Sequence, residues 1–371
     1  MRIHWQKIMS LLKFLREFRQ SLPFRNSRLN FFERYLGRAK FASLPIVLQL
    51  ELTNSCNLKC ASCGHSYWNK KLNESRFIQQ STIEELDSIF PHLSELVFGG
   101  YGEPTLHPKF DEILQYFRVD EHLKISLITN GTLLRKWKPH LEKLNTIILS
   151  MDGVGDIYES HRKIPFGKFV ENLNDLCTLR ASLVKGNKAW EGPFDIEINM
   201  VWNTFTHQNL PKVIEFLSDF PVSRLHLLPE KMYDSGRNSC GLFHLKDLHQ
   251  INMDIQQLKR DSKIDIVYPD FLRFELRCNQ PFDMVFLLSN GELMACCSGI
   301  FHGHKHRFSL GRLEDFGGSF HRLWNQPSMQ RYRKAILGKA DYPEPCKKCA
   351  FRFVMDSSLR RNLDTAEVVD G

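Results

Sequence analysis

Two hydrophobic patterns alternate along most of the chain. One is a short apolar run rich in β-branched residues, which is typical of a buried strand, and the other repeats apolar residues every three or four positions, which is typical of a helix packed on a sheet. The runs that predict strands are Ile46–Leu52, Ser94–Phe98, Lys124–Ile128, Thr146–Leu149, Phe194–Val201 and Arg224–Leu228. The segments that predict helices are Ile83–Leu93, Phe110–Phe117, Leu134–Leu144, Phe169–Leu179 and Leu210–Phe220.

This alternation predicts the fold class. Strands that alternate with helices form a parallel sheet covered by the helices. About six such units close naturally into part of a barrel, whose functional groups lie on the loops that follow the C-terminal ends of the strands. We therefore expect an α/β protein with a partial (β/α)6 TIM-like barrel over residues 41–235, followed by a small C-terminal domain with a β-hairpin and a helix.

The composition agrees with a folded protein. The 371 residues are 42% hydrophobic, which excludes an intrinsically disordered, collagen-like or small disulfide-stabilised chain. No stretch reaches the roughly 18 to 20 apolar residues of a membrane span, and the apolar patch near the N-terminus is interrupted by charges and lacks a signal-peptide cleavage site. We expect a cytoplasmic protein, in which ten cysteines are more typical of metal ligands than of disulfides.

Three cysteines are closely spaced directly after the first predicted strand. Cys56, Cys60 and Cys63 form a C-x3-C-x2-C run. Three such thiolates suit a cubane iron-sulfur cluster, because a short loop can bind three irons and leave the fourth without a protein ligand. Zinc is the alternative, but a structural zinc site takes four ligands, and only His65 is close enough in sequence to complete the set.

The cysteine spacing resembles the defining motif of the radical S-adenosylmethionine (radical SAM) superfamily. Ser62 stands where many members have an aromatic residue. The resemblance implies that Cys56, Cys60 and Cys63 hold a [4Fe-4S] cluster whose open iron binds S-adenosylmethionine. It also implies that one-electron reduction cleaves this molecule to a 5′-deoxyadenosyl radical, with flavodoxin or ferredoxin as the reductant.

Further segments at strand ends resemble the cofactor-binding motifs of that family. The residues implied to bind S-adenosylmethionine are Gly99, Gly100, Gly102 and Glu103 after the second strand, Thr129 and Asn130 after the third, Ser150 and Asp152 after the fourth, and Asn199 in the fifth. Apart from the glycine-rich segment, each is weak evidence alone, since Ser, Thr, Asn and Asp beside Gly also make ordinary turns. Arg162 is a candidate catalytic residue that would pair with a carboxylate of cofactor or substrate, and a solvated surface arginine is the alternative.

A second set of cysteines lies in the last quarter of the chain. Cys278 precedes an Asn290-Gly291 hairpin signal, Cys296 follows it, and Cys346 and Cys349 form a C-x2-C pair. Four such thiolates suit one further cluster or one zinc ion. The pattern resembles the SPASM and shorter twitch domains of radical SAM proteins, which implies one auxiliary [4Fe-4S] cluster and two clusters in all. Cys297 is the alternative to Cys296 as a ligand.

These features divide the chain into five parts. They are a basic amphipathic extension (1–40), the radical SAM partial barrel (41–235), a helical connection (236–277), the SPASM or twitch-like domain (278–355) and a tail (356–371). Residues 1–40 hold ten Lys and Arg against two Glu, and residues 3–22 have apolar residues at helical spacing. This helix packs on the barrel, contacts an anionic membrane surface weakly, or docks to an acidic partner. We expect no nucleic-acid partner because the rest of the chain is neutral.

The resemblance implies an enzyme that abstracts hydrogen from an unactivated C–H bond. The favoured outcome is oxidation or epimerisation of a sugar, aminocyclitol or similar small metabolite, with the auxiliary cluster as electron acceptor. The residues before the barrel are too few for a peptide-recognition domain, but modification of a peptide or protein side chain is the alternative. A non-catalytic iron-sulfur electron carrier or a zinc-stabilised structural protein is the third hypothesis, and the glycine-rich segment with Glu103 argues against it.

Overall fold

The computed structural model describes residues 21–63, 65, 76–118, 122–186, 194–230, 248–268, 278–296, 309–343 and 346. Their strands form one sheet in the order β10-β9-β8-β1-β2-β3-β4-β5-β6-β7. The strands are β1 (Val47–Leu50), β2 (Glu95–Phe98), β3 (Lys124–Thr129), β4 (Thr146–Ser150), β5 (Asp195–Trp202), β6 (Val222–Pro229), β7 (Asp265–Val267), β8 (Met284–Leu287), β9 (Leu293–Met294) and β10 (Ser309–Gly311). Pairing is parallel from β8 through β1 to β7 and antiparallel between β8, β9 and β10.

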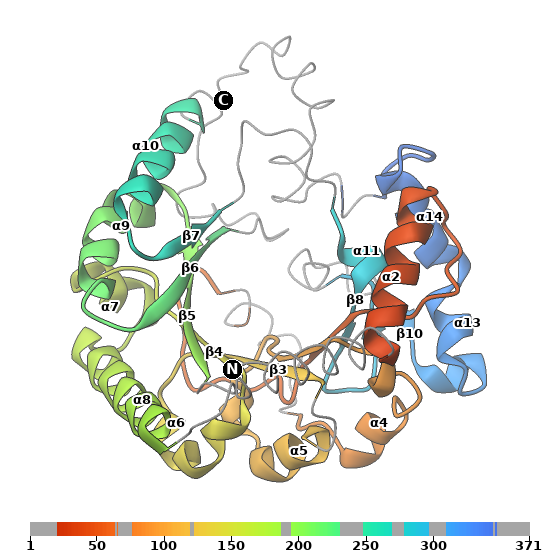
Figure 1. Ribbon diagram of the computed structural model, residues 1–371, viewed down its shortest axis with the longest axis horizontal. Helices are drawn as coiled ribbons and strands as arrows, with labels where there is room; N and C mark the ends of the chain where they lie inside the picture. The colour runs from red at the N-terminus through yellow and green to blue at the C-terminus, as the bar shows by residue number, and fades with distance from the viewer. Residues whose placement is uncertain are drawn as a thin grey trace, which may run out of the picture.

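Helices cover the outer side of this curved sheet (Figure 1). The α-helices are α2 (Leu22–Tyr35), α4 (Gln80–Glu84), α5 (Phe110–Phe117), α6 (Leu134–Trp137), α7 (Asp156–Arg162), α8 (Phe166–Gly186), α9 (Thr204–Leu217), α10 (Leu248–Asp261), α11 (Gln280–Asp283), α13 (Phe320–Trp324) and α14 (Pro327–Ile336). Short 3-10 turns are η1 (Phe90–His92), η2 (Pro104–Leu106), η3 (Lys138–Lys143) and η6 (Leu313–Phe316). None of the described helices is both long and apolar enough to cross a membrane.

The predicted fold class is confirmed, and all six predicted strands are present. Two helix predictions were wrong, because neither segment is a continuous helix. Segment 83–93 contains only the end of α4 and the 3-10 turn η1, and segment 134–144 contains the short helix α6 and the 3-10 turn η3. Pro139 has no N–H for the interior of a helix, and α6 ends two residues before it. Helix α4 ends at Glu84, well before Pro91, which lies in the 3-10 turn η1.

The sheet extends beyond the six predicted units at both edges. On one side β7, from the predicted connection, pairs in parallel with β6. On the other, β8 pairs in parallel with β1, so the predicted C-terminal domain begins as part of the barrel sheet. Its hairpin is confirmed: β8 and β9 are antiparallel, Gly291 has φ 85°, and Asn290 Oδ1 accepts the Glu292 N–H. The five domain boundaries themselves remain predictions.

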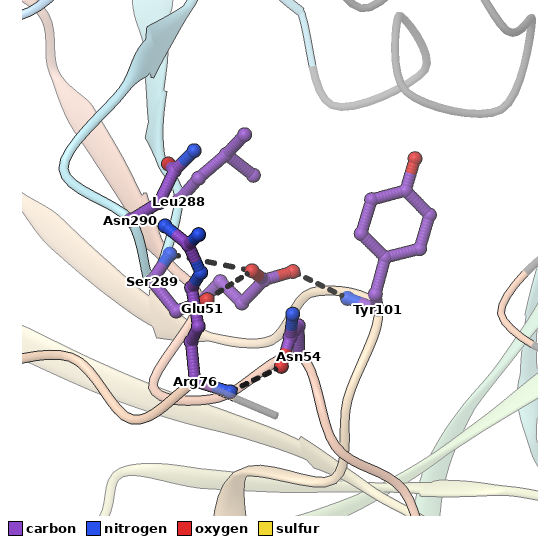
Figure 2. Close-up of a pocket in the computed structure, with 7 residues that line it drawn as sticks. All are labelled: Glu51, Asn54, Arg76, Tyr101, Leu288, Ser289 and Asn290. Carbon is purple, nitrogen blue, oxygen red and sulfur yellow. Dashed lines mark hydrogen bonds between the residues drawn. The ribbon is translucent and has the colours of Figure 1, made fainter. Parts of the chain in front are cut away.

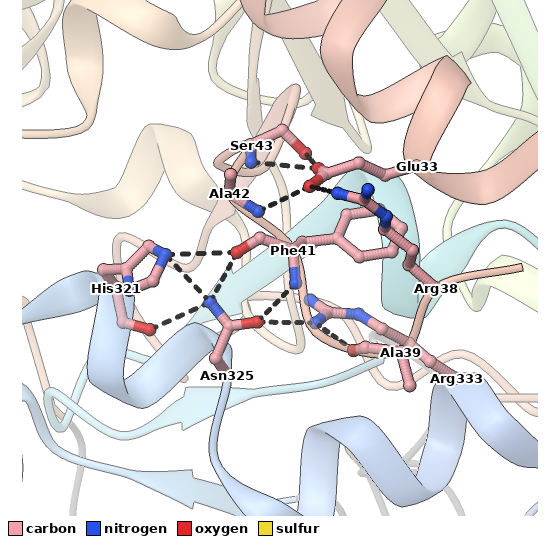
Figure 3. A network of polar contacts seen from close by, with 9 residues as sticks. All are labelled: Glu33, Arg38, Ala39, Phe41, Ala42, Ser43, His321, Asn325 and Arg333. Carbon is pink, nitrogen blue, oxygen red and sulfur yellow. Dashed lines mark hydrogen bonds and ion pairs between the residues drawn. The ribbon is translucent and has the colours of Figure 1, made fainter. Parts of the chain in front are cut away.

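A buried arginine fixes the segment that leads into β1 (Figure 3). Arg333 of α14 donates to the carbonyl of Ala39 and to Oδ1 of Asn325, at 3.0 and 3.3 Å. Its guanidinium lies over the rings of Phe41 and Trp324, 4.6 and 4.4 Å from their centroids. Burial lowers the pKa of Arg333 to about 9. Helix α14 thereby holds the start of the barrel in place.

Candidate active site

A cavity of about 240 Å³ lies at the C-terminal ends of the barrel strands. Eleven of the predicted site residues line it: Cys56, Cys60, Cys63, Gly100, Gly102, Glu103, Thr129, Asn130, Ser150, Asp152 and Arg162. They come from the loops that follow β1, β2, β3 and β4 and from the end of α7. As expected for parallel strands, the residues at their C-terminal ends therefore lie around one cavity.

The thiols of the first cysteine set face this cavity among N–H donors. The Leu58 N–H lies 3.5 Å from Cys56 Sγ, Asn130 Nδ2 lies 3.9 Å from the same sulfur, and Arg162 Nη1 lies 3.8 Å from Cys60 Sγ. Burial raises the pKa of Cys56 to about 12 and also raises that of Cys60. Such thiols become thiolates when a metal centre supplies the compensating charge.

This arrangement fits a cubane iron-sulfur cluster. In such a cluster each cysteine binds a different iron, so the thiols must surround a common space, and hydrogen bonds to the sulfurs are part of the usual surroundings. Among the described residues, no three His, Cys, Asp or Glu side chains are close enough to share a single metal ion. Ligation by Cys56, Cys60 and Cys63 stays a prediction that the cavity supports.

The glycine-rich loop packs directly against the cysteine loop. A Cβ built on Gly102 would lie 2.2 Å from the carbonyl oxygen of Thr53 and 2.4 Å from that of Ser55, closer than any side chain allows. The next residue, Glu103, donates its N–H to the Ser55 carbonyl at 2.7 Å. Glycine at 102 is therefore what lets the Glu103 carboxylate sit beside the cysteines.

Glu103 is buried, and its carboxylate is fixed by neighbours. Oε1 accepts from the Thr105 and Thr129 hydroxyls at 2.5 and 2.6 Å, and Oε2 accepts from the Asn130 N–H at 2.7 Å. Burial raises the pKa of Glu103, although these hydrogen bonds act to lower it. Oε2 makes one of these bonds, so it keeps a lone pair for a further donor.

Arg162 is not solvated: it forms a buried ion pair in the cavity wall. Its Nε lies 2.7 Å from Asp152 Oδ2, and Asp152 Oδ1 accepts the Val201 N–H at 2.8 Å. Burial acts to lower the pKa of Arg162, but the carboxylate of Asp152 raises it above its ordinary value. The site therefore holds a permanent cation beside Cys60.

Two residues predicted to bind the cofactor do not line the cavity. The Gly99 carbonyl instead accepts a hydrogen bond from the Gln49 side chain at 3.0 Å. Asn199 lies within β5 opposite Ser150, and its carbonyl accepts the Met151 N–H. Their main-chain groups are used by the sheet and its first loop, and a role for either residue in cofactor binding stays a prediction.

Sequence reasoning missed Glu230, which also lines the cavity. It directly follows β6 and is buried, and its Oε2 accepts from the Asn203 side chain at 3.1 Å. Burial raises the pKa of Glu230 to about 7, with a smaller contribution from the negative charge of Asp152. The signal was available: Glu230 is the first polar residue after a predicted strand, a position that Thr129 also has.

A smaller pocket of about 90 Å³ adjoins the active-site loops (Figure 2). Its central group is the buried carboxylate of Glu51, just after β1. This carboxylate accepts hydrogen bonds from the Tyr101 N–H and from both the N–H and hydroxyl of Ser289, at 2.9, 3.2 and 2.8 Å. The pocket therefore joins the barrel, the glycine-rich loop and the C-terminal hairpin.

The second cysteine set is described in part. Cys278, Cys296 and Cys346 pack against the edge of the core, whereas Cys297 and Cys349 lie outside the described residues. Tyr332 of α14 is near two of the thiols. Its pKa is raised by burial and by the nearby Cys346 and Cys296, so two cysteines 50 positions apart lie in the neighbourhood of one side chain. Ligation of an auxiliary cluster by this set remains a prediction.

Comparison with known families finds two matches. The family model described as the radical SAM superfamily matches residues 50–182. A second, described as SPASM, an iron-sulfur cluster-binding domain, matches residues 278–350. The first contains the cysteine loop, the glycine-rich loop and the Arg162–Asp152 pair, and the second contains the second cysteine set.

Individual proteins that resemble the chain share between about a fifth and a third of its residues over the aligned parts. The chain is 34% identical over 199 residues to the tungsten-containing aldehyde ferredoxin oxidoreductase cofactor-modifying protein of Pyrococcus furiosus, covering 50% of this chain and 54% of that protein. It thus spans about half the length of that relative. PqqA peptide cyclase of Bradyrhizobium diazoefficiens is 23% identical, covering 86% of this chain and 82% of its own. GTP 3′,8-cyclase of Actinobacillus pleuropneumoniae is 23% identical, and the alignment covers 93% of this chain and 98% of that protein.

A solved structure shares the fold. Streptococcus suis SuiB, bound to its precursor peptide SuiA, superposes with a TM-score of 0.62 at 13% identity, covering 93% of this chain and 78% of SuiB. At this identity the likeness concerns the fold alone.

Proposed function

The chain belongs to the radical SAM superfamily and carries a SPASM domain, and from this premise we propose that it abstracts a hydrogen atom from a peptide or protein side chain. The cofactors of such an enzyme are [4Fe-4S] clusters and S-adenosylmethionine. The observation that carries the proposal is the grouping of the three cysteines, Glu103 and the Arg162–Asp152 pair around one cavity.

The residues of this cavity have distinct roles in the proposal. Cys56, Cys60 and Cys63 would hold the cluster, with one iron open to S-adenosylmethionine. When bound, the cluster and S-adenosylmethionine supply a 5′-deoxyadenosyl radical. Glu103 would accept a hydrogen bond from the ammonium group of the cofactor through the lone pair left on Oε2, and Arg162, held by Asp152, would pair with a carboxylate of cofactor or substrate.

The second cysteine set has a separate role. Cys278, Cys296, Cys346 and Cys349 would hold an auxiliary cluster, as the SPASM match supports. Because the hairpin between Cys278 and Cys296 is part of the barrel sheet, this cluster would lie at the edge of the same body as the active site. A flavodoxin or ferredoxin as the reductant stays a prediction.

A peptide is the substrate class that the relatives favour. PqqA peptide cyclase aligns with most of the chain, and SuiB shares the fold and binds a precursor peptide. The expected oxidation or epimerisation of a sugar or aminocyclitol has no counterpart among these relatives. A small-molecule substrate is the second candidate, since GTP 3′,8-cyclase also aligns along most of the chain.

Metal content tests the cofactor part of the proposal. We expect about eight irons per chain after anaerobic reconstitution and about four in the Cys56/Cys60/Cys63→Ala variant, which also loses 5′-deoxyadenosine formation. Cys177→Ala, on the half-buried face of α8, is the matched control and should keep the native iron content. An unchanged iron content in the triple variant, or cleavage that persists in it, would contradict the assignment.

Isotope transfer tests the substrate class. The reconstituted enzyme is incubated with unlabelled S-adenosylmethionine and an extract of perdeuterated cells divided by size into macromolecular and small-molecule fractions. We expect deuterium in 5′-deoxyadenosine with the macromolecular fraction only, and its loss after protease treatment of that fraction. Deuterium transfer from the small-molecule fraction alone would select the second candidate.

A further inference from the structure

Helix α2 turns a mostly polar face toward the protein, unlike an ordinary surface helix. Such a helix turns its apolar side chains to the core and its charges to water. In α2 the buried side chains are those of Pro23, Asn26, Asn30 and Glu33, three of them polar. The apolar side chains of the helix are therefore left on its outer face.

Specific hydrogen bonds fix this orientation. Asn26 donates to the Leu44 carbonyl at 3.1 Å and accepts the Leu44 N–H at 2.8 Å. Asn30 donates to the Phe282 carbonyl at 2.7 Å. Rotation about the helix axis would break these bonds and bury unpaired polar groups, which is costly.

Glu33 adds a third anchor on the same face (Figure 3). Its carboxylate accepts from the Ala42 N–H at 2.7 Å and from the N–H and hydroxyl of Ser43 at 3.0 and 2.7 Å. It is the only acidic residue between positions 21 and 40, and it is buried. The exposed surface of this segment therefore carries no negative charge.

The exposed face, which we call the α2 face, is made of apolar and basic side chains. The apolar members are Leu22, Leu29, Phe31, Phe32, Tyr35 and Leu36, which are 41% to 81% exposed. The basic members are Arg25 and Arg28, which are exposed, whereas Arg38 pairs with the inward-facing carboxylate of Glu33 at 3.9 Å. Large exposed apolar groups interspersed with Lys and Arg are the composition of helices that lie in the interface of an anionic bilayer.

We propose that the α2 face binds an anionic lipid surface. The aromatic and leucine side chains would enter the boundary between headgroups and acyl chains, and the arginines would contact lipid phosphates. The positive charge of the α2 face is complementary to the negative charge of an anionic lipid surface. A second copy of the chain would set the same basic residues against each other in a symmetric dimer, and residues 1–20, with five Lys and Arg against one Glu, repeat the charge instead of complementing it.

Vesicle sedimentation of the full chain tests the proposal, with a matched pair of double variants. Arg28→Glu/Phe32→Ser alters the α2 face, and Lys212→Glu/Phe205→Ser makes the same changes on α9, where Phe205 is 51% exposed against 50% for Phe32. We expect the native chain to bind phosphatidylglycerol-containing vesicles in preference to pure phosphatidylcholine. We also expect the α2 variant to lose roughly tenfold or more in partition coefficient while the α9 variant keeps native binding.

Three outcomes would overturn the proposal. The first is equal sedimentation with both vesicle types, and the second is native binding by the α2 variant. The third is a change of oligomeric state in the α2 variant without vesicles, which would assign the face to a second copy. If Arg28→Glu/Phe32→Ser does not fold, Arg25→Glu/Phe31→Ser probes the same face. None of these measurements depends on cleavage of S-adenosylmethionine, so the proposed function can fail while this inference holds.

Discussion

The carboxylate of Glu51 and the main chain and hydroxyl of Ser289 are joined by two hydrogen bonds at 3.2 and 2.8 Å, although 238 positions separate them in sequence. The other oxygen of the same carboxylate accepts the Tyr101 N–H. One buried side chain therefore holds together the first strand, the glycine-rich loop and the turn after β8. This contact is independent of the cysteines and can be tested without cofactors.

Glu51→Ala should destabilise the chain strongly. The substitution leaves the buried N–H groups of Tyr101 and Ser289 without their acceptor, and we expect a loss of about 2–4 kcal/mol in the free energy of unfolding. Glu314→Ala, at an exposed position of η6, is the control and should change stability by less than about 0.5 kcal/mol. Urea unfolding of the full chain measures the stability of both variants. If Glu51→Ala is as stable as the native chain, this carboxylate does not hold the first strand, the glycine-rich loop and the turn after β8 together.

Gly102→Ala should separate the glycine-rich loop from the cysteine loop. The added methyl group would meet main-chain oxygens of Thr53 and Ser55, which cannot move aside as a flexible side chain can. We expect a loss of about 3 kcal/mol or more in stability and fewer irons per chain after reconstitution. Gly167→Ala has no atom within 4 Å of the added carbon and should be neutral or slightly stabilising. Native iron content and stability in Gly102→Ala would contradict the close approach.

Much of the fold and of the site follows from local sequence rules. The β3 strand shows the apolar run of a buried parallel strand, and Thr129 and Asn130 come at its end, where a barrel places functional groups. Glu230 obeys the same rule at the end of β6. For these residues the position along a strand predicts where the side chain lies, because parallel strands share one C-terminal edge. The role of Thr129 and Asn130 in cofactor binding comes from the family resemblance.

Other features depend on contacts between distant segments and have no local signal. In helix α2, Asn26 and Asn30 face inward because they donate hydrogen bonds to main-chain carbonyls 18 and 252 positions away, and Phe31 and Phe32 are left exposed. Burial of Arg333 likewise depends on a carbonyl 294 positions away. The hydrophobic periodicity of one segment carries no information about hydrogen-bond partners in a distant segment.

The Arg162–Asp152 pair should show strong coupling. Arg162→Gln leaves the Asp152 carboxylate buried without its cation, so we expect a loss of about 3–5 kcal/mol in stability. Arg162→Gln combined with Asp152→Asn removes both charges and should recover much of this loss, because no buried charge remains unpaired. The exposed pair Lys168 and Glu171, 2.9 Å apart, is the control, for which a double-mutant cycle should give less than about 1 kcal/mol. Additive effects in the buried pair would show that the two charges do not depend on each other.

The raised pKa of Glu230 should make stability depend on pH near neutrality. Burial raises this pKa from 4.5 to about 7, whereas the unfolded chain keeps the ordinary value. Between pH about 4.5 and 7 the folded chain therefore binds the extra proton, and the free energy of unfolding falls as pH rises through this window and levels off above it. A difference of about 2.5 pKa units corresponds to about 3 kcal/mol.

Glu230→Gln isolates this contribution. The amide keeps the shape of the side chain and cannot ionise, so the variant should lose the decline between pH about 4.5 and 7 and be more stable than the native chain at pH 8. Asp219→Asn, at an exposed position, should leave the decline unchanged. Urea unfolding at half-unit pH steps gives the three curves. Parallel curves for the native chain and Glu230→Gln would place the pKa of Glu230 at its ordinary value and would mean that water reaches this carboxylate at the cavity wall.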